Sequence, residues 1–212
     1  MAESLTHLLD APQLLALAAA LGWASGIRLY AAVFLVGLAG FMGFADLPPG
    51  LQVLQHPAVL GVSGSMCFVE FFADKIPFLD TMWDTVHTVI RIPAGAALAA
   101  GALGADSAAM GWIAALLGGG LAATSHTAKL TTRAAVNTSP EPFSNVAVSL
   151  FEDGFVVFML WLSATHPVIF WIALAVTLVI AVVLMIVLVK FLRAVALRLR
   201  GFFDGRRPTQ GS

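Results

Sequence analysis

The stretch APQLLALAAALGWASGIRLYAAVFLVGLAGFMGFA, residues 11–45, decides the fold of this chain. Its only charged residue is Arg28, and Asp10 and Asp46 bound it on either side. About 20 helical residues cross the roughly 30 Å hydrocarbon core of a bilayer, so one straight helix over this stretch would be too long. The segment must tilt, kink or fold back. The small-residue run GWASG, residues 22–26, allows either a local break or a close helix contact.

The rest of the chain is equally apolar. Of its 212 residues, 59% are hydrophobic and 11% are charged. In a typical soluble domain about a quarter of the residues are charged. This composition predicts an all-α, polytopic membrane protein with about five or six transmembrane or re-entrant helices. We expect one transmembrane domain over residues 1–192 and a basic tail over residues 193–212.

Proline and glycine divide the remaining chain into further helices. Pro48-Pro49-Gly50 is expected to close the first segment as a loop, and Pro77 is expected to begin a new helix. Turns are expected at residues 104–107 and 139–142. The predicted helices cover about residues 57–74, 78–103, 108–136, 143–164 and 168–189. The last of them has no charge and is apolar on every side, so we expect it to be the most lipid-exposed span.

Basic residues crowd the C-terminal end of the sequence. Only one acid, Asp204, accompanies six bases: Lys190, Arg193, Arg198, Arg200, Arg206 and Arg207. The positive-inside rule therefore predicts a cytoplasmic C-terminus. A basic stretch that follows an apolar helix orients the protein and contacts anionic lipid, so no nucleic-acid partner is expected. The single cysteine, Cys67, excludes an intrachain disulfide.

Charged residues also lie inside the predicted helices, although each costs at least about 2.5 kcal/mol on membrane-insertion scales. Glu70 and Asp74 are four residues apart and share a helix face, with Lys75 beside them. The next helix repeats polar groups at i, i+4, i+7 and i+11: Asp80, Asp84, His87 and Arg91. Later helices carry a basic face and two further acids: His126, Lys129, Arg133, Glu152 and Asp153.

Several chemical interpretations of these groups compete. Asp80, Asp84 and His87 have a helical spacing compatible with a divalent metal, but no H-E-x-x-H or His-rich motif accompanies them. Lys129 and Arg133 are spaced to grip a phosphate or carboxylate. His87 or His126 is a candidate proton relay. The sequence lacks nucleophile-elbow, P-loop and dinucleotide motifs, so we expect no cofactor.

A weak internal repeat links the two halves of the chain. A small-residue run followed by a base occurs at residues 22–28 and again at residues 120–126. The helices that follow carry Phe68-Val69-Glu70 and Leu150-Phe151-Glu152. Such self-similarity suggests an inverted repeat of the kind found in transporters.

Two long motifs resemble a known family. They are EFFADKIPFLDTMWDTVH followed by RIPAG, at residues 70–87 and 91–95, and HTAK, TR, NTSPEPFSN and ED, between residues 126 and 153. These runs are similar to an uncharacterised bacterial integral membrane family, domain of unknown function 4126, and the resemblance spans about residues 14–190. It implies a multi-pass protein of the bacterial inner (cytoplasmic) membrane and leaves the activity open. It also adds Asn137 to the candidate residues.

The favoured function is a small transporter or channel-like permease for an ion or small charged solute. Its expected partners are the bilayer and that solute, and its Gly- and Ala-rich helix faces also allow a homo-oligomer. The proposed pathway residues are Arg28, Glu70, Asp74, Lys75, Asp80, Asp84, His87, Arg91, His126, Lys129, Arg133, Asn137, Glu152 and Asp153.

Two alternatives remain open. An intramembrane enzyme acting on a lipid head group would use a carboxylate or His87 as general base and would hold phosphate with Lys129 and Arg133. A structural or partner-binding protein would use the same charges only as an assembly network. Transport is preferred because charge of this density exceeds what a small bundle needs for assembly.

Overall fold

The computed structural model describes residues 11–104, 108–138 and 142–204. Within these residues the chain is all-helical, as its composition predicts. The elements are α1 (Ala11–Phe41), the short 3-10 helix η2 (Pro49–Gln55), α2 (Pro57–Ala73), α3 (Leu79–Leu103), α4 (Ala108–Val136), α5 (Pro142–Thr165) and α6 (Pro167–Asp204).

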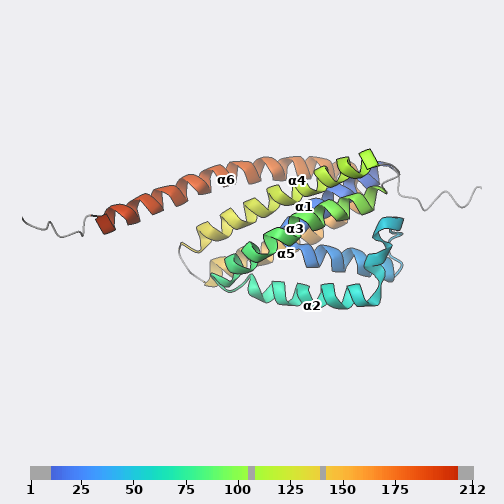
Figure 1. Ribbon diagram of the computed structural model, residues 1–212, viewed down its shortest axis with the longest axis horizontal. Helices are drawn as coiled ribbons and strands as arrows, with labels where there is room; N and C mark the ends of the chain where they lie inside the picture. Colours follow the sequence, from blue (N-terminus) through green and yellow to red (C-terminus); the bar gives the residue numbers. More distant parts are fainter. Residues whose placement is uncertain (1–10, 105–107, 139–141, 205–212) are drawn as a thin grey trace, which may run out of the picture.

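The long helices lie along one common axis, and α1 contacts every other element (Figure 1). We call the end where α1 begins the amino end, on the right of Figure 1, and the end from which α6 projects the carboxyl end. Helices α2, α4 and α6 run from the amino end to the carboxyl end, whereas α3 and α5 run back. Helix α2 lies on the outside of the bundle.

Helix α1 folds back on itself at Arg28. The backbone of Arg28 is non-helical, with φ −142° and ψ 70°. Gln13 and Leu17 from the first half line the same cavity as Val36 and Ala39 from the second half, which a straight helix would hold far apart. The two halves therefore form a hairpin whose ends both lie at the amino end and whose tip reaches the middle of the bundle (Figure 1).

The small-residue run before Arg28 makes close helix contacts. A Cβ atom on Gly22 would lie 2.6 Å from the Cα of Gly118 in α4, and one on Gly26 would overlap Ser125. Gly118 in turn packs against the backbone of Gly95 in α3. Of the two roles expected for residues 22–26, close approach is therefore the one they fill, and the break follows two residues later.

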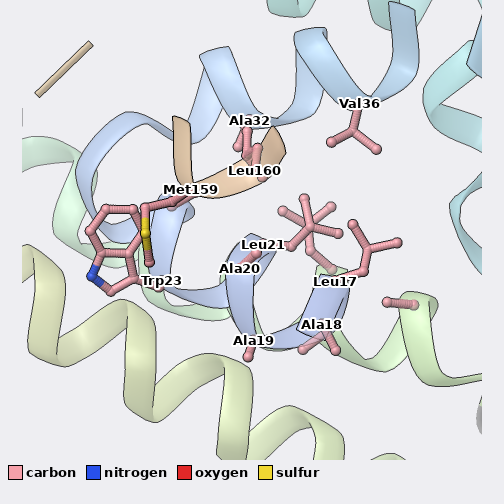
Figure 2. Packing of buried hydrophobic residues seen from close by; sticks show 14 of the residues in the cluster. Leu17, Ala18, Ala19, Ala20, Leu21, Trp23, Ala32, Val36, Met159 and Leu160 are labelled. Carbon is pink, nitrogen blue, oxygen red and sulfur yellow. The ribbon is translucent and has the colours of Figure 1, made fainter. Parts of the chain in front are cut away.

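An apolar core fills the amino half of the bundle. Its centre is the first half of α1, where Ala16, Ala18, Ala19 and Ala20 are completely buried. Figure 2 shows the side chains of Leu17 and Leu21 facing those of Ala32 and Val36 across the hairpin, with Met159 and Leu160 of α5 closing the cluster. Alanine and glycine permit this close packing because they keep the helix backbones near one another.

Five described helices are long and apolar enough to cross a membrane: α1, α3, α4, α5 and α6. Helices η2 and α2, bent by 70° relative to each other, make a sixth if they are counted as one span. This agrees with the expected five or six transmembrane or re-entrant helices. Because α1 returns to the end where it began, it has the shape of a re-entrant segment.

The predicted helix boundaries from residue 57 to residue 165 are correct to within one residue. Two other expectations were wrong. The chain at Pro49 begins η2 rather than a simple loop, because proline suits the first position of a helix. Helix α6 runs on to Asp204 and not to residue 189, so the expected start of a separate tail falls inside a continuous helix. As predicted, α6 is the most exposed span.

Some sequence expectations fall outside the described residues. Gly104, with φ +63°, ends α3, but the rest of the expected turn at residues 104–107 is not described. The same holds for residues 139–141 and 205–212. In the repeat, the first half of α1 and α4 run in the same direction whereas α2 and α5 run in opposite directions (Figure 1). The inverted repeat therefore stays a prediction from sequence.

The two glycines Gly118 and Gly120 test the packing of the α1 hairpin. A Cβ atom at Gly118 would overlap Ala99 and the backbone of Gly95, whereas one at Gly120 would meet nothing within 4 Å. We expect Gly118→Ala to lower the free energy of unfolding by about 1–3 kcal/mol through overpacking. Gly120→Ala should be neutral or stabilising by up to about 1 kcal/mol, because alanine favours helix. Thermal unfolding in detergent measures the stability of both variants. Equal changes in stability would contradict the close packing at Gly118.

Candidate functional site

The charged side chains inside helices α1 to α5, together with those of the turn after α2, gather in the carboxyl half of the bundle. They come from the α1 tip, the end of α2, the first half of α3, the second half of α4 and the first half of α5. Ion pairs of 4.0 Å or less connect all of them into one cluster, which we call the charge network. Its members are Arg28, Glu70, Asp74, Lys75, Asp80, Asp84, Arg91, Lys129, Arg133, Glu152 and Asp153.

Asp74, directly after α2, lies at the centre of the charge network. Its carboxylate pairs with Arg28 at the α1 tip and lies 2.5 Å from the ammonium nitrogen of Lys129. A guanidinium nitrogen of Arg133 is 4.0 Å away. Asp74, Arg28 and Arg133 are all buried. Helices α1 and α4 thus direct three cations toward one carboxylate at the end of α2, which makes Asp74 the main electrostatic link between these helices.

One branch of the network runs along α3. Arg91 pairs with Glu70 at 2.5 Å and with Asp84 at 2.9 Å. Lys129 connects this branch to the centre, since its ammonium nitrogen lies 3.2 Å from Asp84 as well as beside Asp74. Charges at these distances attract strongly in a medium of low dielectric constant. The branch therefore joins α2, α3 and α4 within the bundle.

A second branch reaches the carboxyl end. Arg133 pairs with Glu152 at 2.6 Å and lies 3.9 Å from Asp80. Asn137 donates a hydrogen bond of 2.9 Å to Asp80 and another of 2.9 Å to the hydroxyl of Thr81. Asn137 and Thr81 also line a cavity of about 520 Å³ between α3 and α4. The charge network therefore ends next to a cavity at the carboxyl end.

The remaining edge of the network is partly exposed. Arg28 lies 2.9 Å from Asp153, whose side chain is 27% exposed. Lys75, in the turn after α2, lies 3.4 Å from the same carboxylate. The Lys75 side chain is 15% exposed, so this edge is more solvated than the central pairs.

The break in α1 supplies main-chain acceptors to the network. The carbonyl of Gly26 accepts hydrogen bonds from Arg91 at 3.3 Å and from the Nδ1 of His126 at 3.1 Å. The carbonyl of Ile27 accepts one of 3.0 Å from Lys129. The last carbonyls of a helix have no partner within the helix and carry partial negative charge. The basic residues of α3 and α4 satisfy them.

The two histidines differ in their surroundings. The Nε2 of His126 lies 2.7 Å from the hydroxyl of Thr88, so His126 bridges α3 and the α1 tip. The Nδ1 of His87 instead lies 2.7 Å from the carbonyl of Trp83, and its ring stacks on Trp83. Within the ion pairs of the described residues, His87 takes no part. His126 is thus the histidine that joins the network through hydrogen bonds.

The metal and phosphate hypotheses find little support in this geometry. Asp80 faces Asn137 and Arg133, Asp84 faces Arg91 and Lys129, and His87 lies against Trp83. In the described part of the chain, no group of three His, Cys, Asp or Glu side chains is arranged to hold a metal ion. Lys129 and Arg133, the candidate phosphate ligands, both face carboxylates.

The charge balance of the network is uneven. Its six carboxylates outnumber its five lysine and arginine side chains by one among the described residues. Several buried carboxylate oxygens also accept no hydrogen bond there, including the Oε2 of Glu70, the Oδ1 of Asp74 and the Oδ2 of Asp84. Each of these three carboxylates nevertheless pairs with a cation through its other oxygen or at a longer distance.

Sequence reasoning missed three polar residues of the site. Ser149 accepts a hydrogen bond of 2.8 Å from Arg28, and the side-chain oxygen of Asn145 accepts one of 2.7 Å from Arg133. The hydroxyl of Ser125 donates a hydrogen bond of 2.7 Å to the carbonyl of Trp23 near the α1 tip. One signal was available, because Asn145, Ser149 and Glu152 follow i, i+4, i+7 spacing on one face of α5.

Comparison with known proteins assigns residues 15–187 to the family described as "Domain of unknown function (DUF4126)". The chain belongs to this family, as the sequence motifs suggested. No curated protein matches the chain, and no solved structure matches it.

Asp74 and Asp153 form a matched pair for testing the network. Asp74→Asn leaves Arg28, Lys129 and Arg133 without their shared carboxylate, and breaking a buried ion pair in this way costs about 3–5 kcal/mol. Asp153 is partly exposed, so Asp153→Asn should cost about 1 kcal/mol or less. Unfolding by denaturant in detergent micelles compares the two variants. Similar, small losses would show that Asp74 does not hold the network together.

Proposed function

We propose that this member of the DUF4126 family is a small permease that moves an ion or small charged solute through the charge network, coupled to proton movement. One observation carries the proposal: the network is continuous from the α1 break in the middle of the bundle to the cavity beside Asn137 and Thr81. A pathway needs this continuity, because an isolated charge within the bilayer has no route to water.

The composition of the network suits groups that change protonation. Guanidinium groups keep their protons in proteins, so Arg28, Arg91 and Arg133 act as fixed positive charges. The carboxylates between them can gain or lose a proton, and there is one carboxylate in excess among the described residues. A carrier that couples a solute to protons requires titratable groups held between fixed charges.

The shape of α1 supports the same function. Broken helices that meet near the bilayer midplane are the usual binding elements of secondary transporters, because their ends present unpaired carbonyls and partial charges. The tip of α1 presents the carbonyls of Gly26 and Ile27 to the network. Toward the amino end, the alanine-rich core around Leu21 closes the bundle. This conformation therefore favours access from the carboxyl end.

The remaining basic residues suggest an orientation in the membrane. Outside the charge network, every lysine and arginine of the sequence lies at or beyond Lys190, where α6 leaves the carboxyl end. The segment at residues 42–48, which follows α1 at the amino end, contains none. By the positive-inside rule the carboxyl end faces the cytoplasm, so the proposal includes a bacterial inner-membrane location with the pathway open toward the cytoplasm.

A structural role is the second candidate, and the close pairing of the charges favours it. Arg91, Lys129 and Arg133 each contact a carboxylate within 2.6 Å. Buried pairs of this kind can fix helix positions without any transported solute. The two functions differ in whether neutralising one carboxylate removes activity or removes the fold.

Glu70 separates these functions. Purified protein is placed in liposomes with an entrapped pH dye, and proton movement is followed under an imposed ion gradient. We expect Glu70→Gln to abolish the flux while the protein keeps its gel-filtration profile, since glutamine can still accept a hydrogen bond from Arg91 and Arg91 keeps its pair with Asp84. Asp46→Asn, at the amino end, is the control and should keep the flux. Wild-type flux no greater than that of empty liposomes would sink the permease proposal.

A further inference from the structure

The cavity between α3 and α4 at the carboxyl end is lined by side chains that can accept hydrogen bonds but have no hydrogen left to donate. Its volume is about 520 Å³, a size at which protein cavities hold small organic molecules. Its polar lining side chains are Thr81, Thr85, Asn137 and Thr138. The direction of each of their hydrogen bonds follows from the partner atom.

Two of the threonine hydroxyls donate to the main chain. Thr85 lies 2.7 Å from the carbonyl oxygen of Thr81, and Thr138 lies 2.7 Å from that of Ala135. A carbonyl oxygen can only accept, so each hydroxyl must donate its single hydrogen there. A hydroxyl oxygen also has two acceptor lone pairs. Toward the cavity, Thr85 and Thr138 are therefore acceptors.

Asp80 fixes the direction of the remaining hydrogen bonds. The amide nitrogen of Asn137 lies 2.9 Å from the Oδ1 of Asp80, and an ionised carboxylate can only accept. The same NH₂ group donates to the hydroxyl of Thr81 at 2.9 Å, and that hydroxyl lies 3.2 Å from the Oδ1 of Asp80, to which it donates. The Oδ1 of Asn137 is buried and has no hydrogen-bond partner among the described residues. The cavity lining thus includes a buried acceptor whose hydrogen bond is not formed.

The electrostatics beside the cavity favour a positive ligand. Asp80 is completely buried, and within the described residues its only ion pair is the 3.9 Å contact with Arg133. Arg133 lies closer to Glu152, at 2.6 Å. Helix α4 ends at the cavity and contributes the negative end of its dipole, whereas Asp80 in the first turn of α3 offsets the positive end of that helix. The residues that line the cavity include no lysine and no arginine.

We propose that this cavity binds a small organic cation that carries a primary ammonium group on a short apolar body. The inference rests on the proposed permease function and names its substrate class. An alkylammonium group has three N–H donors and no acceptor. It therefore complements the free acceptors of Thr85, Asn137 and Thr138, and its charge complements that of Asp80.

An anion or a bare metal ion fits the cavity less well. An anion has no hydrogen to donate, so its oxygens would face other acceptors. A bare metal ion would leave the apolar part of the lining uncovered, which consists of Phe78, Met82, Val86 and Ala134. In the described part of the chain, no three metal-ligating side chains are grouped to hold such an ion. An alkyl body covers the apolar wall, and the face of the Phe78 ring attracts a cation.

The first test compares ligands on the wild-type protein. Melting temperatures of the full-length protein in detergent at neutral pH are measured in n-hexylammonium chloride, hexyltrimethylammonium chloride and sodium hexanoate at equal concentration. At about ten times the dissociation constant, n-hexylammonium should raise the melting temperature by roughly 3 °C or more over sodium chloride. Hexyltrimethylammonium lacks N–H donors and hexanoate has the opposite charge, so both should raise it less. An equal shift in either control salt would overturn the proposal.

Two matched pairs of variants locate the binding. Thr85 and Thr127 are both exposed, and both donate at 2.7 Å to the carbonyl four residues earlier, but of the two only Thr85 lines the cavity. Thr85→Val should weaken n-hexylammonium binding roughly tenfold, because a hydrogen bond to a charged group is lost, whereas Thr127→Val should leave it unchanged. Val86 lines the cavity and Val89, also exposed on α3, does not. Val86→Trp should fill the cavity and abolish the shift, and Val89→Trp should keep it. Equal binding within both pairs would overturn the site.

Two further outcomes separate this inference from the permease function. Binding of n-hexylammonium by a protein that shows no flux in liposomes would keep the cavity as an ammonium site and remove the permease function. Flux without n-hexylammonium binding would keep the permease and overturn the ammonium assignment. A lipid head group offers the same ammonium, so phosphatidylethanolamine added to the micelles is the last comparison. A rise in melting temperature with this lipid but not with n-hexylammonium would overturn the assignment to a free solute.

Discussion

A helix that breaks inside a membrane bundle leaves main-chain carbonyls that water cannot reach, and most of this structure depends on how they are satisfied. At the α1 tip, the carbonyls of Gly26 and Ile27 accept hydrogen bonds from Arg91, His126 and Lys129. Buried bases in turn require carboxylates, which α2, α3 and α5 supply. The charge network is therefore the consequence of one break in the first helix, extended outward by the need to neutralise each buried charge.

The α1 hairpin divides the bundle into two parts that are held together by different interactions. In the amino half, alanine and glycine let helix backbones approach closely, as at Gly22 and Gly118. Van der Waals contacts between closely fitting helices therefore hold this half together. Beyond the tip of the hairpin there is no further α1 chain to fill the space between α2, α3, α4 and α5. Charged side chains occupy that space, because long polar groups that pair with one another fill it without leaving buried polar atoms isolated.

The network combines three guanidinium groups, whose charge is permanent, with carboxylates and lysines. Arg28, Arg91 and Arg133 remain positive under all ordinary conditions. Lys129 and the carboxylates lie between the arginines and pair with them or with one another. Lys129 joins the Ile27 carbonyl at the helix break to Asp74 and Asp84, so it connects the α1 tip to the rest of the network.

The sequence by itself determined the helical membrane class, the helix boundaries between residues 57 and 165, the family, and which charged residues stand out, because apolar run length, proline positions and the cost of charge in lipid are local properties. It also indicated shared helix faces, such as Asp80, Asp84 and Arg91. Only the tertiary structure decided that α1 folds back, since residues 22–26 permit a break and a close contact equally well. It alone paired Asp74 with Arg28 and Lys129, and it brought the Ile27 carbonyl to that lysine. These contacts join different helices, and no spacing within one helix encodes which faces meet.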